Sequence, residues 1–392
     1  MGATPRIAID AMGGDDGVRV MLAGAAIAQR RHPDIRFLLC GDEAQIAAGL
    51  GSHADLRAVA DILHTDQVVA ATDKPSAALR KSKNSSMGLA INAVKAGDAG
   101  AAVSAGNTGA LMAIAKLALR TMPGIDRPAL AALLPTLGNN DMVMLDLGAN
   151  TECDVRNLVQ FAVMGAAYSR ILFNLDAPRV ALLNIGTEDL KGTDEIREAA
   201  IRLRESSDVH LKFAGFIEGD KLARGDVDVV VCDGFSGNIA LKTAEGTARF
   251  VADLLRRAFQ SSTRSKIGFL ISRPATDLLR HHLDPNNHNG AVFLGLNGLV
   301  VKSHGGADVL GFRHALHKAH AEVTNGVLDK IARQVAAMPV NAAAAAPVSP
   351  AASSGRSSTA RAASRSTSSS TPTSPSPAPS RTATSSTRTR TS

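Results

Sequence analysis

The chain has 392 residues, a formal net charge of +7, 45% hydrophobic residues and 3% aromatic ones. No run of roughly 18 uninterrupted apolar residues and no signal-peptide-like segment is present, so we expect neither a membrane span nor secretion. The three cysteines are odd in number and far apart, which argues against a disulfide framework or a cysteine metal site and favours the cytosol.

The composition changes near the C-terminal end. From Asn341 onward the chain is almost only Ala, Ser, Thr, Pro and Arg, without acidic or aromatic residues, and it carries six arginines. Such a segment buries too little apolar surface to offset its ordering entropy. We therefore predict one α/β domain over residues 1–338 and a disordered tail over residues 339–392. Without the six arginines the rest of the chain carries only +1 of the total charge.

Four segments show the same order of an apolar strand, a polar loop containing glycine, and a helix start. The strands are expected at 7–10, 101–104, 180–183 and 227–231. A helix start after such a loop offers backbone N–H groups and a positive dipole end to an anion. In an open parallel sheet, these loops lie outside the carboxyl ends of the strands. We therefore predict that the four loops share one crevice that binds phosphate.

The remaining segments predict a mixed sheet with helices. The expected elements, in chain order, are a strand at 35–40, a helix at 44–60, a strand at 61–64, two helical segments between 74 and 95 that meet at 81–86, apolar runs at 128–134 and 142–147, a helix at 155–175, a strand at 211–217 and a final helix at 307–335. The two apolar runs flank a Gly-Asn-Asn turn, which is typical of a hairpin. The fold class is therefore α/β with a mostly parallel, mixed sheet.

Residues 250–283 combine apolar side chains at helical spacing with several cations. Apolar groups bordered by cations suit an anionic membrane surface. Periodicity alone favours the other interpretation, a helical hairpin packed on its own domain or on a twin subunit.

Single residues leave alternatives open. Lys191 is either a phosphate-binding cation or an ordinary exposed loop lysine. Asp233 is either an acid in the site or a helix cap, and Asn238 is either a site residue or a turn residue. Cys232 ends a strand and is expected to be a buried, inert thiol. The histidines between 281 and 288 lack ligand spacing, so we predict no metal.

Seven collinear motifs resemble those of the phosphate acyltransferase family over residues 5–335. They are IAIDAMGG (7–14), SAGNTGALM (104–112), LDLGAN (145–150), NIGTEDLKGTD (184–194), FAGFIEGD (213–220), DGFSGNIALK (233–242) and VKSHG (301–305). The tail has no counterpart expected in that family.

This resemblance implies an acyltransferase that moves a long-chain fatty acyl group from acyl carrier protein to inorganic phosphate. It implies that the acyl phosphate feeds phosphatidic acid synthesis through a membrane glycerol-3-phosphate acyltransferase. It further implies a Rossmann-like three-layer α/β/α fold akin to phosphotransacetylases and isocitrate dehydrogenase, a homodimer, peripheral membrane attachment through 250–283, and a cytoplasmic location. No cofactor and no nucleic acid are expected.

The resemblance and the loop chemistry together give the expected site residues. The catalytic residues are Lys191, Asp233 and Asn238. The substrate-binding residues are Asp10, Gly13, Gly14, Ser104, Gly106, Asn107, Thr108, Asn184, Gly186, Gly234, Ser236 and Gly237. The membrane-contact residues are Phe259, Ile267, Phe269, Leu270 and Ile271.

The chain departs from the family pattern at a few positions. Asp16 stands where the family usually has His, Val18 replaces a Pro, and His288 stands where Tyr is expected. An extra acid near a phosphate would repel it. Neither Lys191 nor Asp233 is affected by these changes.

The chemistry requires little from the protein. Phosphate is itself an oxyanion nucleophile and a thiolate leaves a thioester readily, so holding the anion and stabilising the developing oxyanion suffice. Two other functions remain open: a phosphotransacetylase that uses short acyl-CoA, and a non-catalytic phosphate- or nucleic-acid-binding protein that uses the basic tail.

Overall fold

The computed structural model describes residues 4–337 except 71, 74, 207–209, 285, 287 and 288. The chain divides into two units, Met1–Ala346 and Pro347–Ser392, and all described residues belong to the first. The predicted tail therefore lies outside the described residues.

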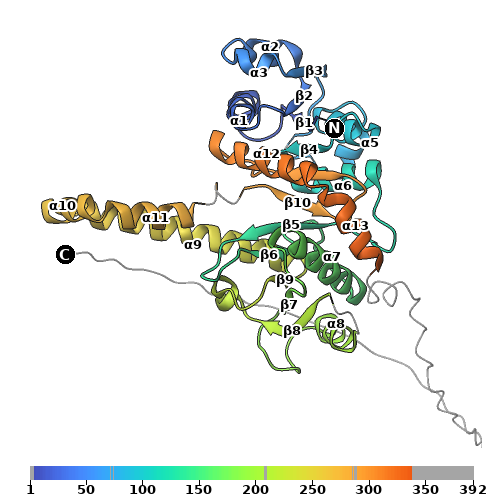
Figure 1. Ribbon diagram of the computed structural model, residues 1–392, viewed down its shortest axis with the longest axis vertical. Helices are drawn as coiled ribbons and strands as arrows, with labels where there is room; N and C mark the ends of the chain where they lie inside the picture. Colours follow the sequence, from blue (N-terminus) through green and yellow to red (C-terminus); the bar gives the residue numbers. More distant parts are fainter. Residues whose placement is uncertain are drawn as a thin grey trace, which may run out of the picture. The chain divides into compact units, whose positions relative to one another are not determined.

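The described part of the chain forms one 11-stranded sheet with the order β3-β2-β1-β4-β11-β10-β5-β6-β9-β7-β8 (Figure 1). The strands are β1 (Arg6–Asp10), β2 (Arg36–Gly41), β3 (Ala60–His64), β4 (Ala101–Ser104), β5 (Ala129–Leu134), β6 (Met142–Leu145), β7 (Arg179–Leu183), β8 (Lys212–Ile217), β9 (Val229–Val231), β10 (Ala291–Leu294) and β11 (Leu299–Lys302).

The helices follow the predicted order. They are α1 (Gly17–Arg31), α2 (Glu43–Leu50), α3 (Ala54–Arg57), α4 (Pro75–Lys81), α5 (Ser86–Ala96), α6 (Thr108–Leu119), α7 (Val155–Phe173), α8 (Asp194–Glu205), the 3-10 helix η1 (Gly219–Arg224), α9 (Gly234–Gln260), α10 (Thr263–Ile271), α11 (Arg273–Leu283), α12 (Val309–Thr324) and α13 (Val327–Ala337).

Two apolar clusters lie on the two faces of the sheet. One packs α1, α7, α8, α12 and α13 against it, and its buried members include Phe161, Tyr168 and Phe312. The other packs α5 and α6, with Met87, Ile91 and Ile114 buried. Sheet residues alternate between the clusters: in β1, Ile7 and Ile9 face the first and Ala8 the second. This alternation is the period of two that a strand buried on both faces requires.

The direction of the strands changes across the sheet. β5 and β6 pair antiparallel, which confirms the predicted hairpin. β6, β9, β7 and β8 are then mutually parallel, and β10 pairs antiparallel with both β11 and β5. Consequently β6, β7, β8 and β9 run opposite to β1, β2, β3, β4 and β11. The carboxyl ends of these two groups lie at opposite edges of the sheet.

Two predicted helices are interrupted. The helix expected at 44–60 ends at Leu50, and α3 and β3 follow it. The helix expected at 307–335 ends at Thr324, and α13 begins after Gly326, which has φ +57°. A glycine adopts this left-handed conformation without the strain that a Cβ would cause, and it therefore allows the chain to change direction between two helices.

α9, α10 and α11 form an arm that extends from the sheet (Figure 1). Of the 27 residues of α9, only Gly234 and Gly237 are buried, both in its first turn. Within the arm, the rings of Phe259 and Phe269 lie 5.3 Å apart. Among the described helices none is long and apolar enough to pass through a bilayer.

Candidate active site

The loops after β1 and β4 meet at the first edge of the sheet. The Ser104 hydroxyl donates a hydrogen bond of 2.7 Å to the Asp10 carboxylate, and the Gly106 amide donates to Ser104 Oγ at 3.0 Å. Burial raises the pKa of Asp10, and the hydrogen bond from Ser104 works in the opposite direction. A Cβ at Gly13 would lie 3.0 Å from the Gly106 amide nitrogen, so glycine allows the two loops to touch.

The other predicted residues of this edge flank that contact. Gly14 has φ +81°, and a Cβ there would lie 3.0 Å from the Gly305 carbonyl. Asn107 is the N-cap of α6 and accepts a hydrogen bond of 2.9 Å from the Ala110 amide, and Thr108 is the first residue of that helix. The structure therefore brings Asp10, Gly13, Gly14, Ser104, Gly106, Asn107 and Thr108 to one place.

Lys302 adds a buried cation to this edge. It ends β11, lies opposite Ser104 in the ladder, and is 9% exposed. Its Nζ donates to the Ala105 carbonyl at 3.4 Å and to the Ser303 carbonyl. Burial lowers the pKa of Lys302 to about 8, helped by the charge of Lys242. Sequence reasoning missed Lys302 because it closes the apolar run Leu-Val-Val, and its only signal was the VKSHG motif.

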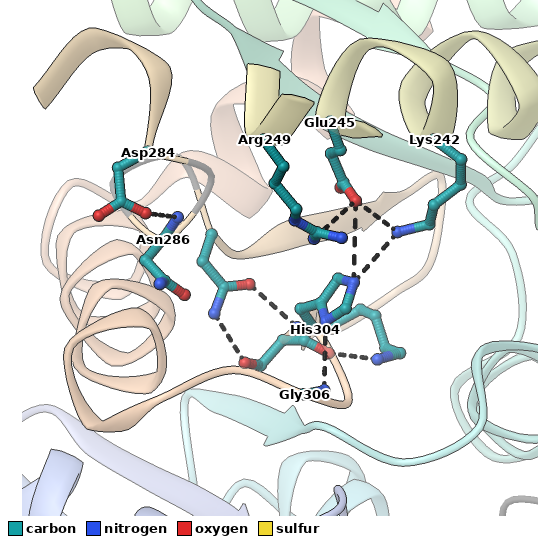
Figure 2. A network of polar contacts seen from close by, with 10 residues as sticks. Lys242, Glu245, Arg249, Asp284, Asn286, His304 and Gly306 are labelled. Carbon is teal, nitrogen blue, oxygen red and sulfur yellow. Dashed lines mark hydrogen bonds and ion pairs between the residues drawn. The ribbon is translucent and has the colours of Figure 1, made fainter. Parts of the chain in front are cut away.

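The polar face of α9 faces the loop that follows β11 (Figure 2). Lys242 Nζ lies 3.0 Å from the Glu245 carboxylate and 3.1 Å from His304 Nε2, and Arg249 lies 3.6 Å from Glu245. The His304 amide donates to Asn289 Oδ1 at 3.0 Å, which fixes the loop after β11. Burial and the nearby Lys242 lower the pKa of His304. A neutral His304 can then accept a hydrogen bond from the Lys242 ammonium group.

The loop after β6 occupies the opposite edge. Asp146 is fully buried, and its carboxylate accepts hydrogen bonds from the amides of Leu130, Ala149 and Asn150 and from the Asn150 side chain. Burial raises the pKa of Asp146, while these donors stabilise the carboxylate. Because all these donors come from the loop and the neighbouring strand, Asp146 holds the loop in shape.

The start of α9 packs directly on that loop. A Cβ at Gly234 would lie 2.5 Å from the Asn150 carbonyl, and one at Gly237 would overlap the Asp146 carbonyl oxygen. These glycines are therefore needed for close packing. Asp233 caps α9: its carboxylate accepts from the Ser236 amide at 2.8 Å and from Ser236 Oγ at 2.9 Å. The Asn238 side chain lies near Gly148, whose Cβ would be 3.6 Å from it.

The loop after β7 lies beside this cluster, because β7 pairs in parallel with β9. Asn184 accepts from the Ile185 amide at 2.9 Å and donates to the Lys191 carbonyl at 3.2 Å, which closes the loop upon itself. Gly186 packs near Lys191 Cγ. The Lys191 side chain is exposed, and among the described residues no polar contact joins it to Asp233.

The prediction that all four loops lie at the same edge of the sheet is therefore wrong. Gly106 lies at the first edge of the sheet, whereas Lys191 and Asp233 lie at the opposite edge. α9 connects the two clusters, because Asn238, Lys242, Glu245 and Arg249 are spaced four, three and four residues apart and share one helix face. Asn238 at one cluster and Lys242 at the other are separated by about 6 Å along the helix axis.

The thiols are inert. Burial raises the pKa of Cys40 and of Cys153 to about 12. Burial likewise raises the pKa of Cys232 well above its ordinary value. A cysteine thiolate is therefore a poor candidate nucleophile at neutral pH.

The structure describes some of the positions at which the chain departs from the family motifs. Asp16 is exposed and pairs with Arg19 at 3.1 Å, one helical turn away. This partner is a surface cation, which reduces the negative charge that Asp16 presents to the loop after β1. His288 lies outside the described residues.

The predicted membrane-contact residues lie on the arm. Leu270 and Ile271 are 68% and 78% exposed, and Ile267 and Phe269 are also exposed. Phe259 is half-buried against Phe269. Exposed Phe235, Ile239, Phe250 and Leu254 extend the apolar surface along α9.

Comparison with protein families matches residues 5–330 to the family described as "Fatty acid synthesis protein". A phosphate acyltransferase from Erythrobacter litoralis is 65% identical over 332 residues, which cover 85% of this chain and 94% of that protein. A phosphate acyltransferase from Parvibaculum lavamentivorans is 56% identical over 326 residues, covering 83% of this chain and 90% of that protein.

Solved structures share the fold at low sequence identity. A phosphotransacetylase from Streptococcus pyogenes superposes with a TM-score of 0.55 at 20% identity, covering 83% of this chain and 95% of that one. A branched-chain phosphotransacylase from Enterococcus faecalis gives a TM-score of 0.50 at 12% identity, covering 81% and 99%. The phosphotransacetylase-like α/β fold expected from the sequence is confirmed.

Proposed function

The chain belongs to the family of fatty acid synthesis proteins whose members include phosphate acyltransferases, and from this premise we propose that it transfers a long-chain fatty acyl group from acyl carrier protein to inorganic phosphate. It is an acyltransferase. The observation that supports phosphate as the acceptor is the group of cations at the first edge. Lys302, Lys242 and Arg249 lie beside the glycine loops there, and Lys242 and Arg249 share the Glu245 carboxylate.

We propose that phosphate lies along the polar face of α9, between the loop after β11 and the loop after β7. A phosphate oxygen attacks the thioester carbonyl, a carbon–oxygen bond forms, and the carbon–sulfur bond breaks to release the carrier's thiolate. Lys242 and Lys302 attract the anion. The Lys191 ammonium group, which makes no hydrogen bond or ion pair among the described residues, and Asn238 stabilise the oxyanion that develops on the carbonyl.

Asp233 receives a narrower role in this proposal. Its carboxylate is held by Ser236 and caps α9, so it fixes the first turn and with it the position of Asn238. The predicted binding residues Asn184, Gly186, Gly234, Ser236 and Gly237 shape the loops around that turn. The raised thiol pKa values support direct attack by phosphate over a cysteinyl intermediate.

The function is tested by following thioester release from palmitoyl–acyl carrier protein with and without phosphate, using acetyl-CoA as the competing donor. We expect phosphate-dependent release from the carrier protein and little from acetyl-CoA. Faster reaction with acetyl-CoA would favour the phosphotransacetylase alternative. Deleting residues 341–392 should leave turnover unchanged, whereas loss of turnover would give the basic tail a role in the reaction.

We further propose that the protein attaches peripherally to membranes through the arm and forms a homodimer. Exposed apolar Leu270 and Ile271 lie near cationic Arg264, Lys266 and Arg273 on α10 and α11. This combination suits an anionic lipid surface. A product with a long acyl chain also favours release at a bilayer, where a membrane glycerol-3-phosphate acyltransferase would use it.

The double variant Leu270→Glu/Ile271→Glu should bind vesicles containing phosphatidylglycerol at least ~10-fold more weakly, because each apolar side chain contributes roughly 1.5–3 kcal/mol on full burial. Co-sedimentation with vesicles measures this. Leu137→Glu, at an exposed leucine outside the arm, is the matched control. A variant that still sediments but loses its dimer in gel filtration would instead support the arm as a subunit contact.

A further inference from the structure

A cluster of histidines lies apart from the candidate active site, between the end of α1 and the middle of α12. The ligand atoms of His32, Asp34 and His320 all lie within 4.8 Å of one another. His317 joins them, because its Nδ1 is 2.7 Å from His32 Nε2. Three imidazoles and one carboxylate therefore lie close together, with His317 placed through its contact with His32.

The sequence explains how the cluster forms. His32 is the C-cap of α1 and its amide bonds to the Ala28 carbonyl, and the chain then turns at Pro33 toward Asp34. On α12, His317 and His320 are three residues apart and therefore share one helix face. α1 and α12 pack closely, since a Cβ at Gly24 would lie 3.0 Å from the Phe312 ring. The two pairs of ligands are thus held on rigid elements.

His320 is the buried member of the cluster. It is 7% exposed, and its ring nitrogen Nε2 lies 3.3 Å from Asp34 Oδ2. The ring of His32 lies 4.8 Å from that of His317 and 4.2 Å from that of His320, centroid to centroid. The first pair of rings is stacked and the second is tilted. Three imidazoles are therefore gathered beside a carboxylate.

We propose that His32, Asp34, His317 and His320 bind a divalent transition metal, with Zn²⁺ the best match, which fastens α1 to α12. Zinc prefers four ligands from imidazole nitrogen and carboxylate oxygen in a tetrahedron. Metal–ligand distances near 2.0–2.1 Å place tetrahedral ligand atoms about 3.3 Å apart. The His320–Asp34 distance of 3.3 Å matches this value, and a small rotation of one imidazole would widen the 2.7 Å pair.

The surroundings limit the choice of metal and its affinity. Mg²⁺ and Ca²⁺ prefer oxygen ligands, so an imidazole-rich set disfavours them. Arg31 and Arg313 act electrostatically on His317, and these cations oppose a bound cation. Asp34 is the one carboxylate among the proposed ligands and is largely exposed. His317 also lines a cavity of about 260 Å³ together with Lys318 and Asn289, which provides a path of entry.

The proposal is tested on the full-length protein after removal of metals with a chelator. Titration calorimetry with Zn²⁺ should give one site per chain. Co²⁺ should produce the visible absorption of a tetrahedral nitrogen–oxygen site. Zn²⁺ should also raise the Tm, because a ligand that binds only the native state stabilises it. None of these measurements depends on acyl transfer, so they test the metal site independently of the proposed function.

Two variants of the proposed ligands and one control variant test where Zn²⁺ binds. His320→Ala should weaken Zn²⁺ binding at least ~100-fold, beyond the loss typical of an outer-shell partner. Because His320 is buried, the half-buried His32→Ala is the second variant and should behave alike. His53→Ala, at the start of α3, should retain wild-type affinity. No bound Zn²⁺ in the wild type, or equal affinity in His32→Ala and wild type, would overturn the proposal.

Discussion

Replacing Lys191 with alanine is expected to lower kcat by roughly 10²–10³-fold, the scale for losing one group that stabilises an oxyanion. The Lys191 side chain is exposed on a loop that Asn184 holds closed. Removing it should leave that loop intact. We therefore expect a smaller change in the KM for acyl carrier protein than in kcat, because the charge acts mainly on the transition state.

Steady-state kinetics at saturating phosphate measures this effect. Lys212→Ala, at another exposed lysine on β8, is the matched control and should keep wild-type kcat. Lys191→Arg should recover part of the activity, because arginine retains the charge but presents a planar, bulkier group. Wild-type turnover by Lys191→Ala would remove Lys191 from the mechanism.

The sequence was sufficient to predict the local units of the fold. The strand–loop–helix order is confirmed at β1, β4 and β7, because an apolar run followed by glycine and a helix cap is decided by neighbouring residues. After β9 the residues expected in a glycine loop, from Gly234 to Asn238, instead form the first turn of α9. Thr193 is the N-cap of α8. Asp233 caps α9, which is the structural alternative that the sequence left open.

The relation between these units was harder to predict. Strand direction depends on pairing, and the expectation of a single edge ignored the consequence of the predicted hairpin. A hairpin between β5 and β6 reverses the chain, so every strand that pairs in parallel with β6 has its carboxyl end at the other edge. The predicted hairpin therefore already contained the information that these strands run in the opposite direction. β10 and β11, of four residues each, were not predicted from the sequence.

The charged residues of the site show a second limit. Lys302 follows an apolar run, and only the pairing of β11 with β4 places it opposite Ser104. From the sequence, the polar residues of α9 resemble an ordinary solvent-exposed helix face. Only the contact between Lys242 and His304 shows that they face the loop after β11. Similarly, His32 and His317 are 285 residues apart, so no local pattern links them. Contacts over such separations are set by topology.

Lys302→Met is expected to stabilise the protein at pH 7 while weakening its use of phosphate. Burial lowers the pKa of Lys302 to about 8 in the folded state, from an ordinary value of 10.5. Below pH 8, Lys302 is therefore protonated in both states, and this charged form has a higher free energy in the folded protein than in the unfolded chain. A difference of this size corresponds to about 3 kcal/mol of destabilisation. Methionine removes that charge but also the hydrogen bonds to Ala105 and Ser303, so we expect a net gain of roughly 1–3 kcal/mol.

The pH dependence gives the sign of this effect. Between about pH 8 and 10.5 the folded state has lost the proton of Lys302 while the unfolded chain retains it, so the free energy of unfolding of the wild type should rise with pH in this window. That rise should be absent from Lys302→Met in urea unfolding experiments. Lys212→Met, at an exposed lysine on β8 that is not among the charges acting on Lys302, is the control and should keep the rise.

Phosphate links this cost in stability to function. A bound dianion favours the charged form of Lys302 and so raises its pKa, which means that phosphate affinity should fall as the pH rises above 8. The KM for phosphate should increase at least ~10-fold in Lys302→Met, the loss expected for one charge-assisted contact. An unchanged KM would exclude Lys302 from the phosphate site. In that case the destabilising charge would have no ligand to compensate it.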